Sequence, residues 1–147
     1  MKCLALIITF LTVFSSCTKD TEEATTTAEY YGKWTLVKMS GSIINSVRTG
    51  TAMEWQEYYL FKNDGTFEKH RIRNSVETKA VGTYTRIDYQ DGKYLELLYA
   101  NNSEIIGSCY GNLNEELYFA TDTTLSSSWN ACDGPGLEYQ KEDSNFN

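Results

Sequence analysis

Short runs of alternating apolar and polar residues, separated by turn residues, fill the chain from about residue 30 to residue 141. The runs are rich in Tyr, Val, Ile, Thr, Trp and Phe, side chains that fit the pleated, half-buried surface of a β-sheet. This pattern predicts eight strands: Lys33–Met39, Trp55–Lys62, Thr66–Arg73, Lys79–Tyr89, Lys93–Ala100, Glu104–Tyr110, Glu116–Thr121 and Gly136–Lys141.

Several connections between these runs are short. Asn63-Asp64-Gly65 and Gln90-Asp91-Gly92 carry an Asp-Gly pair, which tolerates the positive φ of tight turns, and Asn112-Leu113-Asn114 is a further expected turn. Pro135, the only proline, lies in a turn before the last strand. The segment Ser40–Met53 is too long for a hairpin and is expected to hold a loop or a short helix. Short links between consecutive strands favour an antiparallel meander.

A meander of eight strands leaves two unpaired edges unless the sheet closes on itself. We therefore expect an all-β domain, an antiparallel up-and-down barrel of eight strands, with a β-sandwich as the alternative. A three-residue turn at Asn63–Gly65 would place Phe61 and Phe67 on one side of the sheet, together with Tyr59 and Trp55. The interior of such a barrel is filled by its own side chains or holds one small ligand.

The first 29 residues follow a different pattern. Met1-Lys2, the apolar run Leu4–Phe14 and two small serines are typical of a secretory signal peptide, and the run is too short to span about 30 Å of hydrocarbon. Residues 18–29 contain no large apolar side chain and are expected to form a flexible tether. The expected organisation is a signal peptide at 1–16, Cys17 and the tether at 17–29, a barrel domain at 30–141 and a disordered tail at 142–147.

The segment Phe14-Ser15-Ser16-Cys17 resembles the lipobox of bacterial lipoproteins, in which the cysteine becomes the first residue and is acylated. The resemblance implies that palmitate and similar chains on Cys17 attach the protein to the outer membrane, at its periplasmic face or at the cell surface. A plain signal peptide without lipid is the alternative. Lys19-Asp20 followed by Glu22-Glu23 resembles a signal for surface export in some Gram-negative lipoproteins, although an ordinary solvated tether fits it equally well.

Removal of residues 1–16 leaves 131 residues, enough for one domain with its own core. Lys2 leaves with the signal, so 12 basic and 20 acidic residues give the mature chain a net charge of −8. An acidic surface argues against nucleic-acid binding and against electrostatic attachment to anionic lipid, both of which need basic patches. An anchored protein of this charge would therefore depend on its acyl chains.

Cys109 and Cys132 remain once Cys3 leaves with the signal and Cys17 carries lipid. An exported, oxidising environment favours a disulfide between them. The alternatives are a metal site and a reactive thiol, but a metal site would need further Cys or His residues and the chain has one His. We expect no metal and no cofactor.

Gly32-Lys33-Trp34, at the start of the first expected strand, matches the Gly-x-Trp motif of lipocalins, in which the Trp closes the bottom of the barrel. The stretch Tyr58–Phe67, followed by Gly82-Thr83-Tyr84, is similar to small lipocalin-like lipoproteins of Gram-negative bacteria. The resemblance extends over about Tyr30–Lys141 and implies an eight-stranded barrel. The chain departs from large lipocalins in having no clear Thr-Asp-Tyr motif, no C-terminal helix, and Lys141 where they place an Arg over the Trp.

Catalysis is not expected. His70, the only His, lies in the charged run Glu68–Arg73, which is typical of a solvent-facing strand, and no Gly-x-Ser-x-Gly elbow accompanies it. Adjacent carboxylates such as Glu115-Glu116 point to opposite faces of a strand, so they do not converge on a substrate as a glycosidase pair must.

Aromatic side chains on the expected strands are the remaining candidates for binding. They would line a ligand cavity or form an ordinary core. The expected function is a lipid-anchored barrel that binds a small apolar or aromatic molecule. The alternative is a non-enzymatic interaction or inhibitor module with a filled barrel, which would bind an envelope protein through loops such as Ser40–Met53 or Thr121–Ala131. The candidate ligand-binding residues are Trp34, Trp55, Tyr59, Phe61, Phe67, Tyr84, Tyr94, Leu97 and Tyr99.

Overall fold

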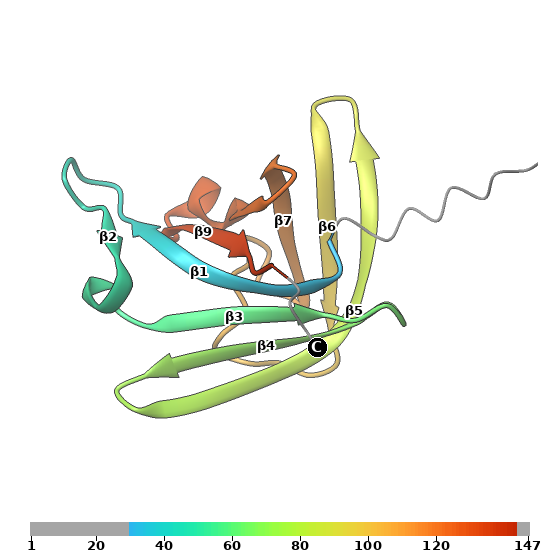
Figure 1. Ribbon diagram of the computed structural model, residues 1–147, viewed down its shortest axis with the longest axis horizontal. Coiled ribbons are helices and arrows are strands. Elements are labelled where there is room, and N and C mark those ends of the chain that lie inside the picture. Colours follow the sequence, from blue (N-terminus) through green and yellow to red (C-terminus); the bar gives the residue numbers. More distant parts are fainter. Residues whose placement is uncertain (1–29, 144–147) are drawn as a thin grey trace, which may run out of the picture.

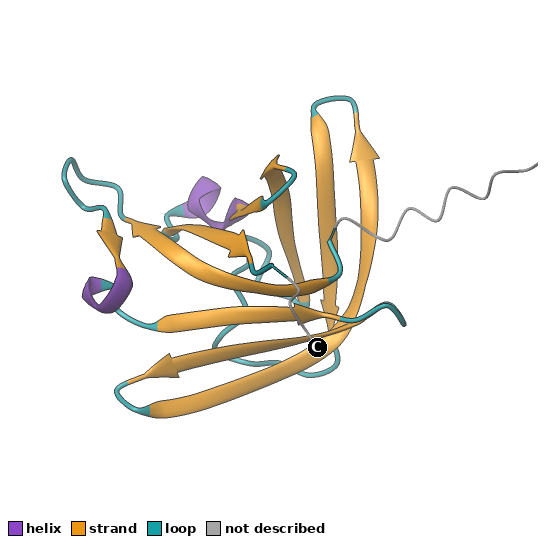
Figure 2. Cartoon of the chain, viewed as in Figure 1, coloured by secondary structure: helices purple, strands orange, loops and turns teal. Residues whose placement is uncertain are grey.

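The computed structural model describes residues 30–143 (Figure 1). Strands in which buried and exposed residues alternate pair into one antiparallel sheet, which closes into a β-barrel. Two short 3-10 helices interrupt the strands (Figure 2). The elements are β1 (Gly32–Ser40), β2 (Arg48–Thr49), η1 (Gly50–Ala52), β3 (Gln56–Phe61), β4 (Thr66–Arg73), β5 (Val76–Tyr89), β6 (Gly92–Tyr99), β7 (Asn114–Thr121), β8 (Thr124–Ser127), η2 (Ser128–Cys132) and β9 (Gly136–Lys141).

Neighbouring strands pair in the order β2-β1-β3-β4-β5-β6-β7-β8-β9, and β1 also pairs with β9. Eight strands therefore form the closed meander that the sequence predicts, while β2 is a two-residue addition paired with β1. Closure leaves each barrel strand with a partner on both sides, which removes the exposed edges of an open sheet. Among the described residues, no helix has the length and apolar character needed to cross a membrane.

The β3–β4 hairpin has the expected three-residue turn, in which Gly65 has a φ of +81°. The Asp64 carboxylate accepts a hydrogen bond from the Thr66 backbone N–H at 2.9 Å, which stabilises the turn. Phe61 pairs directly with Phe67, so both rings lie on one side of the sheet, as predicted, and both are buried inside the barrel.

Strand β5 is long and belongs to both halves of the barrel. Its first part pairs with β4 and its second part pairs with β6, and Gly82 takes part in both pairings. Figure 1 shows this strand bending from the β3–β4 layer up to the β5–β6 hairpin. A Cβ on Gly82 would overlap the carbonyl oxygen of Leu98 and lie 2.8 Å from Cε1 of Phe67, so glycine permits the close approach of the strands.

Two of the expected elements differ from the structure. The predicted strand Glu104–Tyr110 is wrong, because this segment is part of the irregular connection between β6 and β7. Its apolar residue Ile105 is buried because the connection packs back against the barrel, where the Ile105 carbonyl accepts a hydrogen bond from Arg71. The eighth barrel strand is β8, which lies within the segment Thr121–Ala131 that was expected to be a loop. Leu125 is the only large apolar residue of β8, so the sequence signal for a strand is weak. The strand is held by its hydrogen-bonded pairings with β7 and β9.

Candidate functional site

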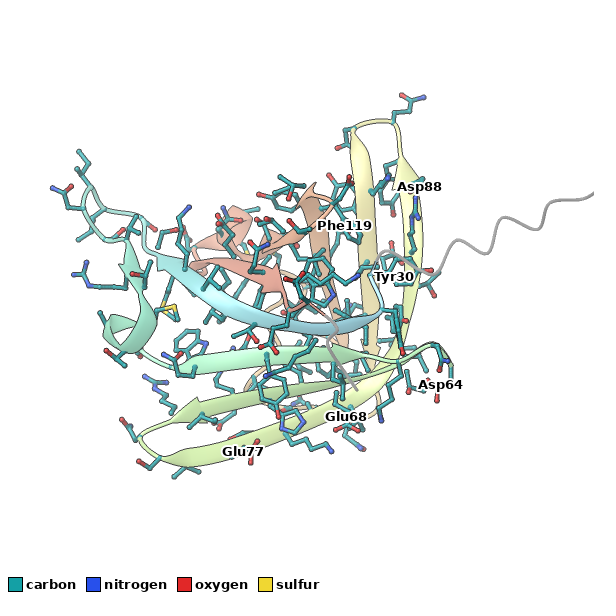
Figure 3. All side chains as sticks on the ribbon, viewed as in Figure 1. Tyr30, Asp64, Glu68, Glu77, Asp88 and Phe119 are labelled. Carbon is teal, nitrogen blue, oxygen red and sulfur yellow. A yellow bond between two sulfur atoms is a disulfide. The ribbon has the colours of Figure 1, made fainter. Side chains whose placement is uncertain are left out.

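The barrel interior holds most of the aromatic side chains that the sequence singles out. Figure 3 shows side chains crowding the space that the strands enclose. Tyr84 is partly buried against this core, whereas Tyr94 lies on the outer face of β6. The candidates buried in the core are Trp34, Trp55, Tyr59, Phe61, Phe67, Leu97 and Tyr99.

These rings pack against one another. The ring centroids of Tyr59 and Phe61 are 5.5 Å apart, and those of Phe67 and Tyr99 are 4.9 Å apart in an edge-on arrangement. The Phe61 and Tyr84 rings also meet edge-on at 4.9 Å. These separations are those of favourable aromatic pairs, so the rings serve as one another's packing partners.

Trp34 is fully buried in the barrel. Its indole N–H donates a hydrogen bond to the Tyr30 carbonyl at 2.8 Å, and its ring meets Phe119 edge-on at 6.0 Å. Figure 3 labels both of these neighbours. The ammonium of Lys141 lies over the Trp34 ring, 5.9 Å from the centroid. Lys141 thus occupies the position over the tryptophan that the lipocalin resemblance gives to an arginine.

A buried ionic network lies among the aromatic rings. Lys69 has no exposed side-chain surface, and its ammonium is 3.0 Å from Glu115 Oε1 and 3.3 Å from Glu57 Oε1. Arg71 pairs with the second oxygen of Glu57 and donates to the Ile105 carbonyl at 3.3 Å. Two carboxylates and two cations therefore balance within the core, as buried charges require.

Three tyrosine hydroxyls complete this network. Tyr59 donates to Glu115 at 2.8 Å, Tyr139 donates to Glu57 at 2.5 Å, and Tyr99 donates to the second oxygen of Glu115. Burial raises the pKa of all three phenols well above its ordinary value, and the neighbouring carboxylates raise it further. The phenols are therefore neutral donors that satisfy the carboxylates from within the protein.

Sequence reasoning missed this network, although a signal for it was present. Glu57 stands between Trp55 and Tyr59 at the two-residue spacing of inward side chains, and Lys69 stands two residues after Phe67. Because alternate residues of a strand share one face, inward aromatic residues at these positions place Glu57 and Lys69 in the interior as well. Charge alone favours solvent exposure, and the compensating partners on other strands are visible only in the fold.

Trp55 lies just before β3, beside two arginines. The guanidinium of Arg71 is 4.3 Å from the centroid of its ring, and that of Arg73 is 5.8 Å away. The Trp55 indole nitrogen is buried and has no hydrogen-bond acceptor among residues 30–143. Such an unpaired donor costs free energy in the folded protein.

A groove of about 490 Å³ lies on the outside of the barrel, over β5, β6 and β7. One wall is the segment Ser108–Tyr110 of the β6–β7 connection, which the disulfide between Cys109 and Cys132 ties to η2. This disulfide confirms the expected cysteine pair. The groove lining includes Thr83, Tyr89, Glu96, Leu98, Tyr110 and Glu116.

His70, the one candidate base, belongs to a surface network. Its ring stacks on Tyr58 at 4.5 Å, with Nδ1 2.7 Å from Glu77 and Nε2 3.2 Å from Glu68. Both glutamates project from the outer face of β4 and β5 (Figure 3). Hydrogen bonds from Lys62, together with those from a second lysine and His70, lower the pKa of Glu68 to about 2. These contacts explain the histidine as part of a hydrogen-bonded cluster on the outer face of the sheet.

The structure does not describe the residues on which the expected lipid anchor and most of the expected tail depend. Cys17, the signal peptide and the tether precede residue 30, and most of the expected tail follows residue 143. Within residues 30–143, no three His, Cys, Asp or Glu side chains form a group that could hold a metal ion.

Comparisons with protein-family models, with curated proteins and with solved structures find no match to this chain. Its function therefore has to be inferred from its own sequence and geometry.

Proposed function

We propose that this chain is a lipid-anchored, lipocalin-like barrel of the bacterial cell envelope, which binds a small molecule with an apolar or aromatic body and catalyses no reaction. The observation that carries the proposal is the outer groove over β5, β6 and β7. Aromatic rings and a hydrogen-bonded ionic network occupy the barrel interior. The outer surface is therefore the better candidate for a binding site.

The groove has the size of a small-molecule site and a lining that mixes polar and apolar side chains. Its volume of about 490 Å³ falls within the range of ligand pockets, which is roughly 300–1,000 Å³. Leu98 is 53% exposed and Tyr110 is 75% exposed, so both offer apolar surface that a ligand would cover. The disulfide restrains the wall that carries Tyr110, which reduces the entropy lost on binding.

The binding test uses the full-length protein purified from host membranes in detergent. Native mass spectrometry should show a retained small molecule, and calorimetry should show binding of 4-phenyl-1-butanol or its amine analogue. Leu98→Lys should abolish both, because it places a charge in the groove. Val81→Lys is the matched control, since Val81 is a partly exposed residue of β5 outside the groove lining and its replacement should leave binding intact.

Three outcomes separate the possibilities. Loss of binding in Leu98→Lys alone supports the outer groove. Undiminished binding in both variants would place the ligand elsewhere, such as the barrel interior, and would overturn the groove assignment. If wild-type protein retains no small molecule and binds neither aromatic probe, the small-molecule function is wrong.

The anchor is tested separately. Cys17→Ala should move the protein from the membrane fraction to the soluble fraction and abolish incorporation of labelled palmitate, because the sulfur atom that starts lipidation is gone. Cys3→Ala is the control that keeps the lipobox residues. Equal membrane association of both variants would contradict lipid anchoring.

A second candidate function is protein binding through the segment between β1 and β2. Ile43 and Ile44 are 77% and 91% exposed, and Val47 is also exposed, so apolar side chains gather at one loop. Exposed apolar patches of this kind mark interaction sites. Ile43→Ser with Ile44→Ser should abolish crosslinking to an envelope protein in intact cells, whereas Val76→Ser at the exposed start of β5 should not. Unchanged crosslinking in the double variant would exclude this loop.

A further inference from the structure

We propose that the outer groove selects an organic cation, namely a small amine whose apolar or aromatic body lies on the groove. The proposal rests on the proposed function of this groove as a small-molecule site and names its ligand class.

Two carboxylates stand directly opposite each other in the groove. Glu96 on β6 pairs in register with Glu116 on β7, and both side chains line the outer groove. Directly opposed residues of an antiparallel pair have Cβ atoms roughly 4.5–5.5 Å apart, so like charges at these positions destabilise the sheet. Local arrangements that cost stability are typical of functional sites.

A third carboxylate adds to this negative potential. Asp91 lies in the β5–β6 turn and, with Tyr89 and Glu116, lines a shallow hollow of about 560 Å³ that adjoins the groove. Burial raises the pKa of Glu116, and the charges of Glu96 and Asp91 raise it further. A bound cation would relieve this repulsion, so its binding is favoured by an interaction that a neutral ligand lacks.

Two tyrosines lie beside these carboxylates, Tyr89 hydrogen-bonded to Glu96 and Tyr94 hydrogen-bonded to Asp91. Tyr89 donates a hydrogen bond to Glu96 at 2.8 Å, and its ring meets Tyr94 edge-on at 5.2 Å. Tyr94 in turn lies 6.2 Å from Tyr118 on β7. Aromatic faces attract ammonium groups as well as apolar surface, so Tyr89 in the groove and Tyr94 in the adjoining hollow suit both parts of an amine ligand.

The same observations favour an organic cation over a metal ion. Ca²⁺ takes six to eight oxygen ligands at close range, whereas the groove is lined in part by Leu98, Tyr110 and the methyl-bearing Thr83. Its volume of about 490 Å³ also exceeds what a single ion fills. An apolar surface beside a carboxylate pair matches a ligand that carries one positive group on an apolar body.

The experiment compares two probes that share a phenylbutyl body and end in an ammonium group or in a hydroxyl. Binding of 4-phenylbutylamine and of 4-phenyl-1-butanol to the full-length protein is measured by calorimetry at pH 7.5, in 20 mM and 300 mM NaCl. The amine should bind at least about tenfold more tightly at low salt, and the difference should shrink at high salt because exposed charges are screened. Glu96→Gln with Glu116→Gln should remove the preference for the amine over the alcohol.

Glu54→Gln is the matched control, because Glu54 is an exposed carboxylate outside the lining of the groove, paired with Arg73. It should leave the preference for the amine intact. A second readout needs no ligand. The melting temperature should rise in Glu116→Gln, because the opposed like charges are gone, and should not rise in Glu54→Gln.

Each alternative outcome has a distinct meaning. Equal affinity for the amine and the alcohol would overturn the cation proposal while the groove remains a small-molecule site. Binding of neither probe would overturn the proposed function itself. Tighter binding of Ca²⁺ alone than of the amine, lost in the double glutamine variant, would replace the organic cation with a metal ion.

Discussion

Lys69 is the cation that contacts both carboxylates of the buried ionic network. Its ammonium compensates two buried carboxylates, those of Glu57 and Glu115, and neither has exposed side-chain surface. Lys69→Met keeps the approximate volume but leaves two negative charges with less compensation in a medium of low polarity. Removing one partner of a buried ion pair costs about 3–5 kcal/mol. We expect the free energy of unfolding to fall by about this amount, as measured by urea denaturation.

Lys79→Met provides the control for this prediction. Lys79 pairs with Glu68 on the outer face, where its side chain is 49% exposed. Exposed pairs contribute about 0–1 kcal/mol, so this variant should stay close to the wild type. Equal destabilisation by the two substitutions would show that Lys69 has no special role in the core.

The three buried phenols make stability sensitive to alkaline pH. The pKa values of Tyr59, Tyr99 and Tyr139 are raised in the folded protein, whereas in the unfolded chain a phenol titrates near 10. Above about pH 10 the unfolded chain therefore releases protons that the folded protein retains, and stability falls as pH rises. Each phenol contributes a slope of up to about 1.4 kcal/mol per pH unit.

Two measurements check this expectation. Absorbance at 295 nm should show that part of the 11 tyrosines does not ionise until the protein unfolds. Denaturation between pH 8 and pH 12 should show a shallower loss of stability in Tyr99→Phe than in the wild type. Ionisation of every tyrosine near pH 10 in the folded protein would contradict the network.

At the scale of elements, β5 depends on a glycine where it passes from β4 to β6. A methyl group on Gly82 would overlap the Leu98 carbonyl and crowd Phe67, and backbone atoms cannot move aside cheaply. Gly82→Ala should lower the free energy of unfolding by about 1–3 kcal/mol, the usual cost of overpacking. Gly41→Ala should be close to neutral, because a Cβ there would lie 3.4 Å from Ser46 and the glycine has no positive φ. Thermal melting of both variants tests the difference.

Most of the strands were predictable because their residues alternate and their turns carry recognisable residues. Phe61 and Phe67 face each other across the β3–β4 turn as the Asp-Gly signal indicates, and β4 and β9 have the predicted bounds. The segment Glu104–Tyr110 was misassigned because Ile105-Ile106 has the composition of a strand although it packs as a loop. β8 was missed because its serines and threonine carry little hydrophobic signal.

The outer groove was harder to predict than the barrel. Glu96 and Glu116 come together through the register of two strands, and a shift of one residue in either would point one of them inward. The wall at Tyr110 depends on a connection without regular structure. Tyr94 and Leu97 were predicted to line an interior cavity, but Tyr94 lines the adjoining outer hollow and the Leu97 side chain is buried in the core. The alternation of residues along the sequence therefore predicts the strands, whereas the outer groove depends on which strands pair and in which register.

At the scale of the whole molecule, the disulfide affects both the stability of the barrel and the shape of the proposed binding surface. The bond between Cys109 and Cys132 ties the β6–β7 connection to η2 across 23 positions of sequence. Replacing both cysteines by serine frees this loop in the unfolded chain, so the free energy of unfolding should fall by about 3 kcal/mol. The same change frees the wall that carries Tyr110, and ligand affinity should fall because the wall must then be ordered on binding.

Stability and affinity can be measured separately on the double serine variant. Urea denaturation gives the first, and calorimetry with 4-phenylbutylamine at a temperature where the variant stays folded gives the second. Dithiothreitol should lower both quantities in the wild type and change neither in the variant, which identifies the disulfide as the cause. A less stable variant with unchanged affinity would show that the tethered connection braces the barrel but takes no part in holding the ligand.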